Sequence, residues 1–333
     1  MRVGEGNCPI HLFCPLLSVD AICIFGLKGS NLVYTYWAYG LKVESQLPFP
    51  ELLPLQNDAP CDLTVVWGSI PVIDKTINGF HSASYDITPT CYRITINDVA
   101  SYFVREGKSI VIEACENAEQ DSIRLFCLSN AFAAALHQRK TIPLHCAALI
   151  DKGELVLILG DSGAGKSTTM ASLMQKGLQP FSDDVCVPLD NPETAKICFF
   201  SSYPMMKFWK ETIELFGLEN EVDRRIRPDM EKYGIYFHQS FLTHALNPKL
   251  IILLEKTDQV SSPILAPISG IELFTRLESN AYRGEYLGFS DLKKEHFMLF
   301  TQLANQSACF VLKRPSAGNF VQEVAGKIIN LLN

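Results

Sequence analysis

The sequence predicts a mixed α/β (α+β) protein in which a smaller, mostly β domain precedes a domain built around a phosphate-binding loop. Three observations support this fold class. Short apolar runs separated by Pro, Gly, Asn and Asp fill residues 26–115. A helical hydrophobic period follows over 119–140, and GDSGAGKS at 160–167 matches GxxxxGK[ST]. We therefore expect a first domain over 1–118, a connecting helix, and a second domain over 141–333.

The composition narrows the class of protein. The chain has 333 residues and is 47% hydrophobic, enough to fill a sizeable core. Its net charge of -7 argues against nucleic acid or an anionic membrane surface as a partner. The eleven cysteines are never spaced as CxxC, which indicates reduced side chains rather than disulfides or a zinc site. Pro15 and Asp20 interrupt the apolar N-terminal stretch, so we expect no membrane span or signal peptide, and a cytoplasmic protein.

The first domain contains four stretches with the composition of β-strands, which are LVYTYWAYGLKVES, CDLTVVWGSIPVI, CYRITINDVASYFV and SIVIEACE. The segment that follows places its apolar residues at helical spacing. We expect this helix to end near Arg139 and Lys140 because Pro143 follows, and proline cannot continue a helix.

The second domain opens with two apolar runs, PLHCAALI and ELVLILG, which predict strands joined by a turn at 151–153. After the phosphate-binding loop, a helix STTMASLMQK should end before Gly177, and a strand LQPF should return the chain to the loop. Beyond it we expect a helix over MMKFWKETIELFG, a charged segment over 221–237, a strand KLIILLE, and helices with one strand, ACFVLKR, after Gly270.

The loop carries the residues needed to hold a nucleotide phosphate. Its three glycines let the backbone bend so that successive N–H groups and the start of the following helix face an anion. Lys166 should reach the β- and γ-phosphates, and the Ser167 hydroxyl should ligate Mg²⁺. ATP and Mg²⁺ are therefore the predicted cofactors. The predicted nucleotide-binding residues are Gly160, Asp161, Ser162, Gly163, Ala164, Gly165, Lys166, Ser167 and Thr168.

Two adjacent aspartates follow the loop closely, since Asp183 lies 17 residues after Lys166. One carboxylate of such a pair can ligate magnesium or its waters while the other accepts a proton from an attacking hydroxyl. The alternative is a turn with two solvated carboxylates. His145, in PLHCAAL, is a further candidate, although a lone histidine in an apolar strand is more often structural.

The ordered set PLHCAAL, LILGDSGAGKST and QKGLQPFSDDV resembles the catalytic domain of HPr kinase/phosphorylase, whose nucleotide fold is related to phosphoenolpyruvate carboxykinase. The resemblance implies transfer of the γ-phosphate of ATP to a serine hydroxyl. It implies that His145 and Asp183 act near this hydroxyl, with Asp183 as the base. It also implies that Ser167 and Asp184 hold magnesium, although the sequence leaves the division between the two aspartates open. The bifunctional relatives are hexameric, so self-association is implied as well.

Two features separate the chain from the bifunctional enzymes. It lacks their ELRGLG-type stretch after the acidic pair, which argues against phosphorylase activity and against docking to HPr. Its N-terminal part is instead similar to a branch that includes kinases of lasso-peptide precursors. The expected acceptor is therefore a serine-containing peptide or small protein, recognised in part by the first domain.

In that branch basic residues recur within and after the KFW segment, here at Lys207, Arg225, Arg227 and Lys232. Phosphoryl transfer gathers negative charge that needs cations besides one lysine and magnesium. Lys232 and Arg227 are the predicted phosphate or acceptor contacts, and a solvated charged loop is the alternative.

Two other functions use the same motifs. A kinase of a free small molecule such as serine would share the site, although a β-rich domain favours a peptide because a strand edge can capture an extended chain. A nucleotide-gated binding protein without kinase activity would use the loop only to sense ATP, but the nearby acidic pair favours chemistry. A carboxykinase is a weaker alternative because its metal-binding lysine and histidine cannot be placed upstream of the loop.

Overall fold

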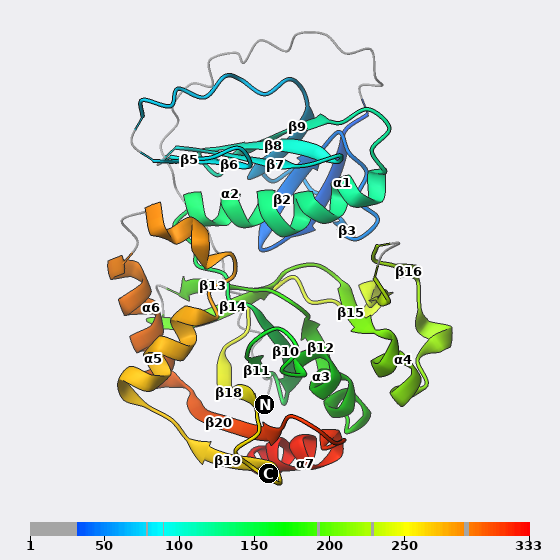
Figure 1. The fold of residues 1–333 in the computed structure, drawn as a ribbon, viewed down its shortest axis with the longest axis vertical. Helices are drawn as coiled ribbons and strands as arrows, with labels where there is room; N and C mark the ends of the chain where they lie inside the picture. Colours follow the sequence, from blue (N-terminus) through cyan, green and yellow to red (C-terminus); the bar gives the residue numbers. More distant parts are fainter. Residues whose placement is uncertain (1–31, 78, 89, 192–193, 228–229, 290–292) are drawn as a thin grey trace, which may run out of the picture. The chain divides into compact units, whose positions relative to one another are not determined.

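The computed structural model describes residues 32–77, 79–88, 90–191, 194–227, 230–289 and 293–333 (Figure 1). All of them belong to one compact unit, Asn31–Asn333. The N-terminal stretch with Pro15 and Asp20 lies outside the described residues. Within the described part of the chain, no helix has the length and apolarity needed to cross a membrane.

Residues 34–114 form a nine-stranded sheet with the order β3-β1-β2-β4-β9-β8-β7-β6-β5. Most neighbours are antiparallel, but β4 pairs in parallel with β2 and with β9. Burial alternates along β2, as expected for a sheet with one face on a core. The strands are β1 (Tyr34–Ala38), β2 (Leu41–Ser45), β3 (Leu53–Pro54), β4 (Leu63–Trp67), β5 (Phe80–His81), β6 (Tyr85–Ile87), β7 (Cys91–Ile96), β8 (Ala100–Arg105) and β9 (Ser109–Ala114).

The expected connecting helix forms three consecutive helical segments, α1 (Gln120–Phe126), a π-helical turn (Cys127–Ala131) and α2 (Phe132–Gln138). Its apolar side chains share a core with the nine-stranded sheet, and α2 lies against β8 and β9 (Figure 1). Tyr102 of β8 donates its hydroxyl to the Ile123 carbonyl oxygen at 2.8 Å, which ties the sheet to α1.

A six-stranded sheet with the order β12-β10-β11-β18-β20-β19 carries the phosphate-binding loop. Its strands are β10 (Cys146–Asp151), β11 (Glu154–Leu159), β12 (Gln179–Ser182), β18 (Pro248–Thr257), β19 (Ile264–Pro267) and β20 (Ala308–Pro315). The main helices beside it are α3 (Lys166–Gln175), α5 (Gly270–Ser279), α6 (Lys293–Gln306) and α7 (Val321–Leu332). On β11, Val156 and Ile158 join a core with α3 and α7, whereas Leu155 and Leu157 join a core with α5 and α6. The strand is therefore covered on both faces, which explains its continuous apolar sequence.

Smaller elements connect these parts. They are the hairpin of β13 (Cys186–Asn191) and β14 (Lys196–Ser201), the sheet of β15 (Met205–Trp209), β17 (Lys232–Tyr236) and β16 (Arg224–Arg225), helix α4 (Lys210–Phe216), and 3-10 turns at Glu219–Glu221, His238–Ser240 and Gly284–Phe289.

The prediction of a helix over MMKFWKETIELFG is wrong in its first half. Met205–Trp209 is a strand because it pairs along its whole length with β17, and four of its five residues are buried. The charged segment, for which no element was expected, supplies β16 and β17.

The first sheet and the phosphate-loop part share side-chain cores. Trp37 of β1 is buried in a core that also contains residues of β10, β11 and α3. At the β1–β2 turn, the Tyr39 backbone N–H donates to the Ser202 carbonyl oxygen at 2.8 Å. Gly40 has a φ of +79°, and a Cβ there would lie 2.5 Å from the Phe200 ring. Glu51, buried after β2, pairs with Arg124 of α1 at 3.1 Å. The sequence pattern changes near residue 118, but the side-chain packing between the first sheet and the rest of the chain continues across this position.

His137 of α2 should make stability depend on pH. It is buried, its Nε2 lies 2.8 Å from the Tyr282 carbonyl oxygen, and its Nδ1 has no partner among the described residues. Burial lowers the pKa of His137 from 6.5 to about 4. Between these values the unfolded chain binds the proton and the folded chain does not, so stability falls as pH drops from about 6.5 to about 4, by roughly 3 kcal/mol in all.

Urea unfolding at a series of pH values checks this expectation in the wild type and in His137→Gln, which keeps a side-chain N–H but cannot titrate. The slope of stability against pH should be smaller in the variant across this window. Equal slopes in the two proteins would mean that His137 does not contribute.

Candidate active site

The phosphate-binding loop leaves β11 and enters α3 through three glycines with left-handed backbone angles. Gly160, Gly163 and Gly165 have φ values of +146°, +80° and +106°. A Cβ at Gly160 would lie 2.3 Å from the Leu254 carbonyl oxygen, so a side chain is excluded there. No side chain among the described residues caps the start of α3. Its first N–H groups are therefore available to an anion, as in helix N-terminal phosphate sites.

Lys166, the first residue of α3, folds back over the loop. Its Nζ donates to the carbonyl oxygens of Gly160 at 2.6 Å and Asp161 at 3.3 Å. Burial lowers the pKa of Lys166, and the neighbouring aspartates oppose this shift. The ammonium group thus lies where it can serve the phosphates that the loop would bind.

Two side chains from distant parts of the chain hold the loop in place. Arg314, at the end of β20, donates through Nε to the Ala164 carbonyl oxygen at 2.8 Å. Asn280, just after α5, accepts the Gly160 N–H on Oδ1 at 2.9 Å, and its backbone oxygen accepts the His145 N–H at 2.8 Å. The loop and the histidine are therefore positioned by the same residue.

Asp183, which follows β12, lies against the start of α3. Ser167 donates its hydroxyl to Asp183 Oδ1 at 3.2 Å, and the Lys207 backbone N–H donates to Oδ2 at 2.7 Å. The residue is only 4% exposed. Burial raises the pKa of Asp183, and the adjacent Asp184 raises it further.

Asp184 has a different environment. Its φ of +82° is unusual for a residue other than glycine and turns its side chain onto a second set of partners. Lys207 Nζ lies 2.9 Å from Oδ2, and His145 Nδ1 lies 3.3 Å from Oδ1 and 2.9 Å from the Asp184 carbonyl oxygen. Burial raises the pKa of Asp184, but Lys207 and His145 outweigh it and hold this pKa well below its usual value. Asp184 stays ionised, and 24% of its side chain is exposed.

Aromatic rings surround this second carboxylate. Lys207 Nζ lies 5.4 Å from the Tyr203 ring, the His145 ring lies 5.9 Å from the Tyr282 ring, and the Tyr39 ring of the first sheet lies 5.7 Å from that of Tyr203. Burial and the charge on Asp184 both raise the pKa of Tyr282. The three tyrosines, Asn280 and Arg314 belong to no sequence motif, so sequence reasoning missed them. Lys207 stands out in the sequence only as one of several basic residues.

The two remaining predicted cations face different aromatic rings. Lys232 of β17 has its Nζ 5.7 Å from the Trp209 ring, and its charge lowers the pKa of both Asp183 and Asp184. The Arg227 guanidinium lies 5.7 Å from the Phe126 ring of α1. Lys232 is therefore placed near the acidic pair, while Arg227 faces the connecting helix.

The donors beside the loop suit magnesium. The Ser167 hydroxyl and the Asp183 carboxylate are hard oxygen ligands 3.2 Å apart at the start of α3. Magnesium keeps several waters and is commonly held by one or two protein oxygens together with substrate phosphates. The two side chains fit such a site, whereas the two oxygens of Asp184 are engaged by Lys207 and His145.

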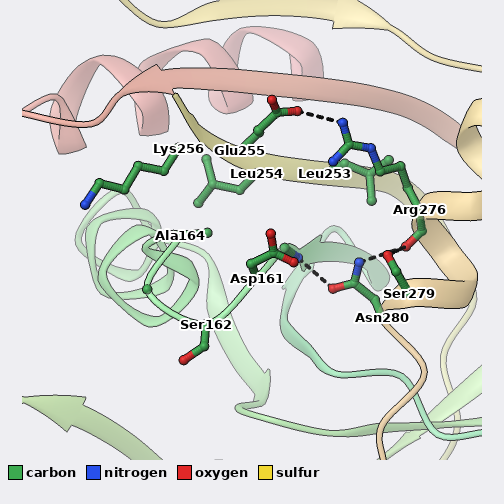
Figure 2. A pocket seen from close by; sticks show the side chains of 12 residues that line it. Asp161, Ser162, Ala164, Leu253, Leu254, Glu255, Lys256, Arg276, Ser279 and Asn280 are labelled. Carbon is green, nitrogen blue, oxygen red and sulfur yellow. Dashed lines mark hydrogen bonds and ion pairs between the residues drawn. The ribbon is translucent and has the colours of Figure 1, made fainter. Parts of the chain in front are cut away.

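A cavity of about 280 Å³ opens on the other side of the loop, where β18 ends (Figure 2). In Figure 2 the side chain of Asp161 lies between Glu255 and Asn280. Arg276 pairs with Glu255 at 2.9 Å across the cavity wall. The cavity is lined by Gly160, Asp161, Ser162, Gly163, Ala164, Leu253, Leu254, Glu255, Lys256, Arg276, Ser279 and Asn280.

Fold and site together define a mixed α/β protein in which the glycine-rich loop 160–167 lies beside an acidic pair. No family model matches the chain, and no curated protein matches it. Among solved structures, it is similar to the Hpr(Ser) kinase/phosphatase from Coxiella burnetii, at 15% sequence identity and a TM-score of 0.24, over 57% of this chain and 87% of that one. A likeness at this level defines neither the family nor the activity of this chain.

Asn280→Ala should weaken ATP binding about tenfold, because the Gly160 N–H would lose its buried acceptor, at a cost of about 1–3 kcal/mol. The bond from His145 goes to the Asn280 backbone, so the substitution affects mainly the loop. Equilibrium binding of ATP measures the effect, with exposed Asn305→Ala of α6 as the control. Equal ATP affinity in Asn280→Ala and the wild type would refute the positioning role.

Proposed function

We propose that the protein is an ATP- and Mg²⁺-dependent kinase that transfers the γ-phosphate to a serine hydroxyl of a peptide or small protein. One observation carries the proposal. The Ser167 hydroxyl of the phosphate-binding loop is bonded to Asp183, and the next residue presents a second, ionised carboxylate held by His145 and Lys207. A loop that only sensed ATP would not need this second carboxylate and its histidine partner.

The loop side of the site would bind the phosphates. The N–H groups at the start of α3 and the ammonium of Lys166 supply positive charge on that side. Ser167 and Asp183 would hold magnesium, which when bound neutralises charge on the phosphate oxygens. Lys207 and Lys232 add cations near the carboxylates, where charge spreads during transfer.

We assign the proton acceptor to Asp184 rather than to Asp183, the reverse of the division expected from the resemblance. Both oxygens of Asp183 accept hydrogen bonds from within the protein, and its side chain is nearly inaccessible. Asp184 is partly exposed and has His145 beside it to share a proton.

The pKa shifts favour the opposite division, because the pKa of Asp183 is raised and that of Asp184 is lowered. Accessibility nevertheless favours Asp184. The burial that makes Asp183 the stronger base also keeps it from a substrate hydroxyl, and a magnesium ion beside it would lower its pKa again. In a loose phosphoryl-transfer transition state, moreover, a weak base that is well placed suffices.

The edges of the nine-stranded sheet bear on how an acceptor could bind. The nine-stranded sheet ends at β3 and β5, each only two residues long, and such short edges offer little length for pairing with a peptide. We therefore expect the acceptor to bind near Asp184 and Tyr282 more than along a sheet edge. Peptide recognition by the first domain, a role for Arg227 and self-association stay predictions.

Mass spectrometry of peptides encoded beside the gene, incubated with the protein, ATP and Mg²⁺, tests the proposal. We expect a gain of one phosphate on a serine, lost in Lys166→Ala. Phosphorylated free serine instead of peptide would identify a small-molecule kinase. Nucleotide-dependent partner binding without any phosphorylated product would identify a nucleotide-gated binding protein and overturn the proposal.

A further inference from the structure

The cavity beside the loop and the acidic pair lie on opposite sides of β11. In the sheet order β12-β10-β11-β18, the acidic pair follows β12, and the cavity is formed where β18 ends. The loop that follows β11 therefore separates the two. A molecule bound across the loop would have one end at Asp183 and the other end in the cavity.

The position of the magnesium donors orients a nucleotide in this arrangement, an inference that rests on the proposed function. Ser167 and Asp183 mark the end at which the β- and γ-phosphates would lie. The α-phosphate and the nucleoside must then extend away from the acidic pair. The cavity at β18 lies on that side of the loop and could take them.

The walls of the cavity have the chemistry to recognise a ribose. Glu255 of β18 presents a carboxylate that Arg276 of α5 fixes through a bond of 2.9 Å. An ionised carboxylate has about four acceptor positions, so this one bond leaves capacity for ligand hydroxyls. A carboxylate accepting from ribose hydroxyls is a recurring feature of nucleotide sites in α/β proteins. Glu255 is 26% exposed, consistent with access from the cavity.

We propose that the cavity is a ribonucleoside subsite in which Glu255 binds the ribose hydroxyls and discriminates ATP from 2′-deoxy-ATP. Arg276 acts as a positioning residue that holds the carboxylate. The pocket of about 280 Å³ is close to the lower end of the usual range for small-molecule sites.

Equilibrium binding of three probes, ATP, 2′-deoxy-ATP and inorganic triphosphate, tests the subsite without requiring phosphoryl transfer. The wild type should bind ATP about tenfold more tightly than 2′-deoxy-ATP, because one hydrogen bond to a charged group is lost. In Glu255→Ala, ATP and 2′-deoxy-ATP should bind with equal, weakened affinity, while affinity for inorganic triphosphate stays unchanged. The matched control is Glu272→Ala, an exposed acid in the first turn of α5 that does not line the cavity.

Arg276→Ala separates ribose binding from a purely structural ion pair. If Glu255 only stabilised Arg276, both substitutions would change the binding of all three probes alike, and the proposal would fail. It would fail too if the wild type bound ATP and inorganic triphosphate equally. ATP binding with the expected discrimination but no phosphorylated product would leave the subsite intact and overturn only the kinase proposal.

Discussion

Asp184→Asn should lower kcat for phosphoryl transfer by roughly 10²–10⁴-fold while leaving the Mg²⁺ requirement unchanged. The substitution removes the accessible carboxylate beside His145 but keeps the contact between Ser167 and Asp183. Asp183→Asn should instead raise the Mg²⁺ concentration needed for half-maximal rate, because it removes a negatively charged oxygen ligand. Initial rates at a series of Mg²⁺ concentrations measure both effects.

The outcome decides the division between the two aspartates. Asp190→Asn is the control because Asp190 is an exposed acid farther along the same segment, in β13. If Asp183→Asn lost kcat at saturating Mg²⁺ and Asp184→Asn shifted the Mg²⁺ requirement, the assignment would be reversed. ATP binding should persist in all three variants, since the loop and Lys166 are unchanged.

Trp37→Ala should lower the free energy of unfolding by about 3–5 kcal/mol, the usual cost of truncating a buried aromatic residue. The Trp37 ring lies 5.3 Å from the Phe241 ring and 6.1 Å from the Phe200 ring, within the core that also contains α3 and β11. Removing it leaves a cavity between β1 and the phosphate-loop part. Urea unfolding followed by fluorescence and by loss of ATP binding should show both signals moving to lower denaturant together.

Val72→Ala is the control for this experiment because Val72 is 99% exposed, and such a change should stay within about 0.5 kcal/mol. Two separate transitions, with ATP binding unaffected by Trp37→Ala, would show that the first sheet is a separable domain. The shared cores predict the opposite. For the same reason, a truncation of residues before Glu119 should not fold, so acceptor binding is better tested by point substitutions.

The elements around the loop could be predicted from the sequence because they depend on interactions between residues close together in the chain. The apolar runs before the loop, the helix after it and the return strand are all present as β10, β11, α3 and β12. One segment differs from its prediction. Met205–Trp209 has apolar residues compatible with a helix, but pairing with β17, a strand formed from a charged segment, makes it a strand. Pairing of that kind depends on the tertiary fold.

The candidate site divides in the same way. Gly160, Lys166, Ser167 and the two aspartates could be predicted because their spacing reflects one strand, one turn and one short helix. Asn280 could not, because it lies 120 residues from the Gly160 backbone that it holds. Arg314, which holds the other side of the loop, is 150 residues from Ala164.

By itself, the sequence predicted a glycine-rich loop of the phosphate-binding type with an acidic pair brought back beside it. The loop depends on the backbone conformations of its glycines, and the position of the acidic pair depends on the short helix and strand that follow. Both involve residues close together in the chain. Only the tertiary structure decided which carboxylate lies against Ser167 and which against Lys207 and His145. Adjacent residues in a chain can have different partners, because a single left-handed backbone angle at Asp184 turns its side chain toward another part of the fold.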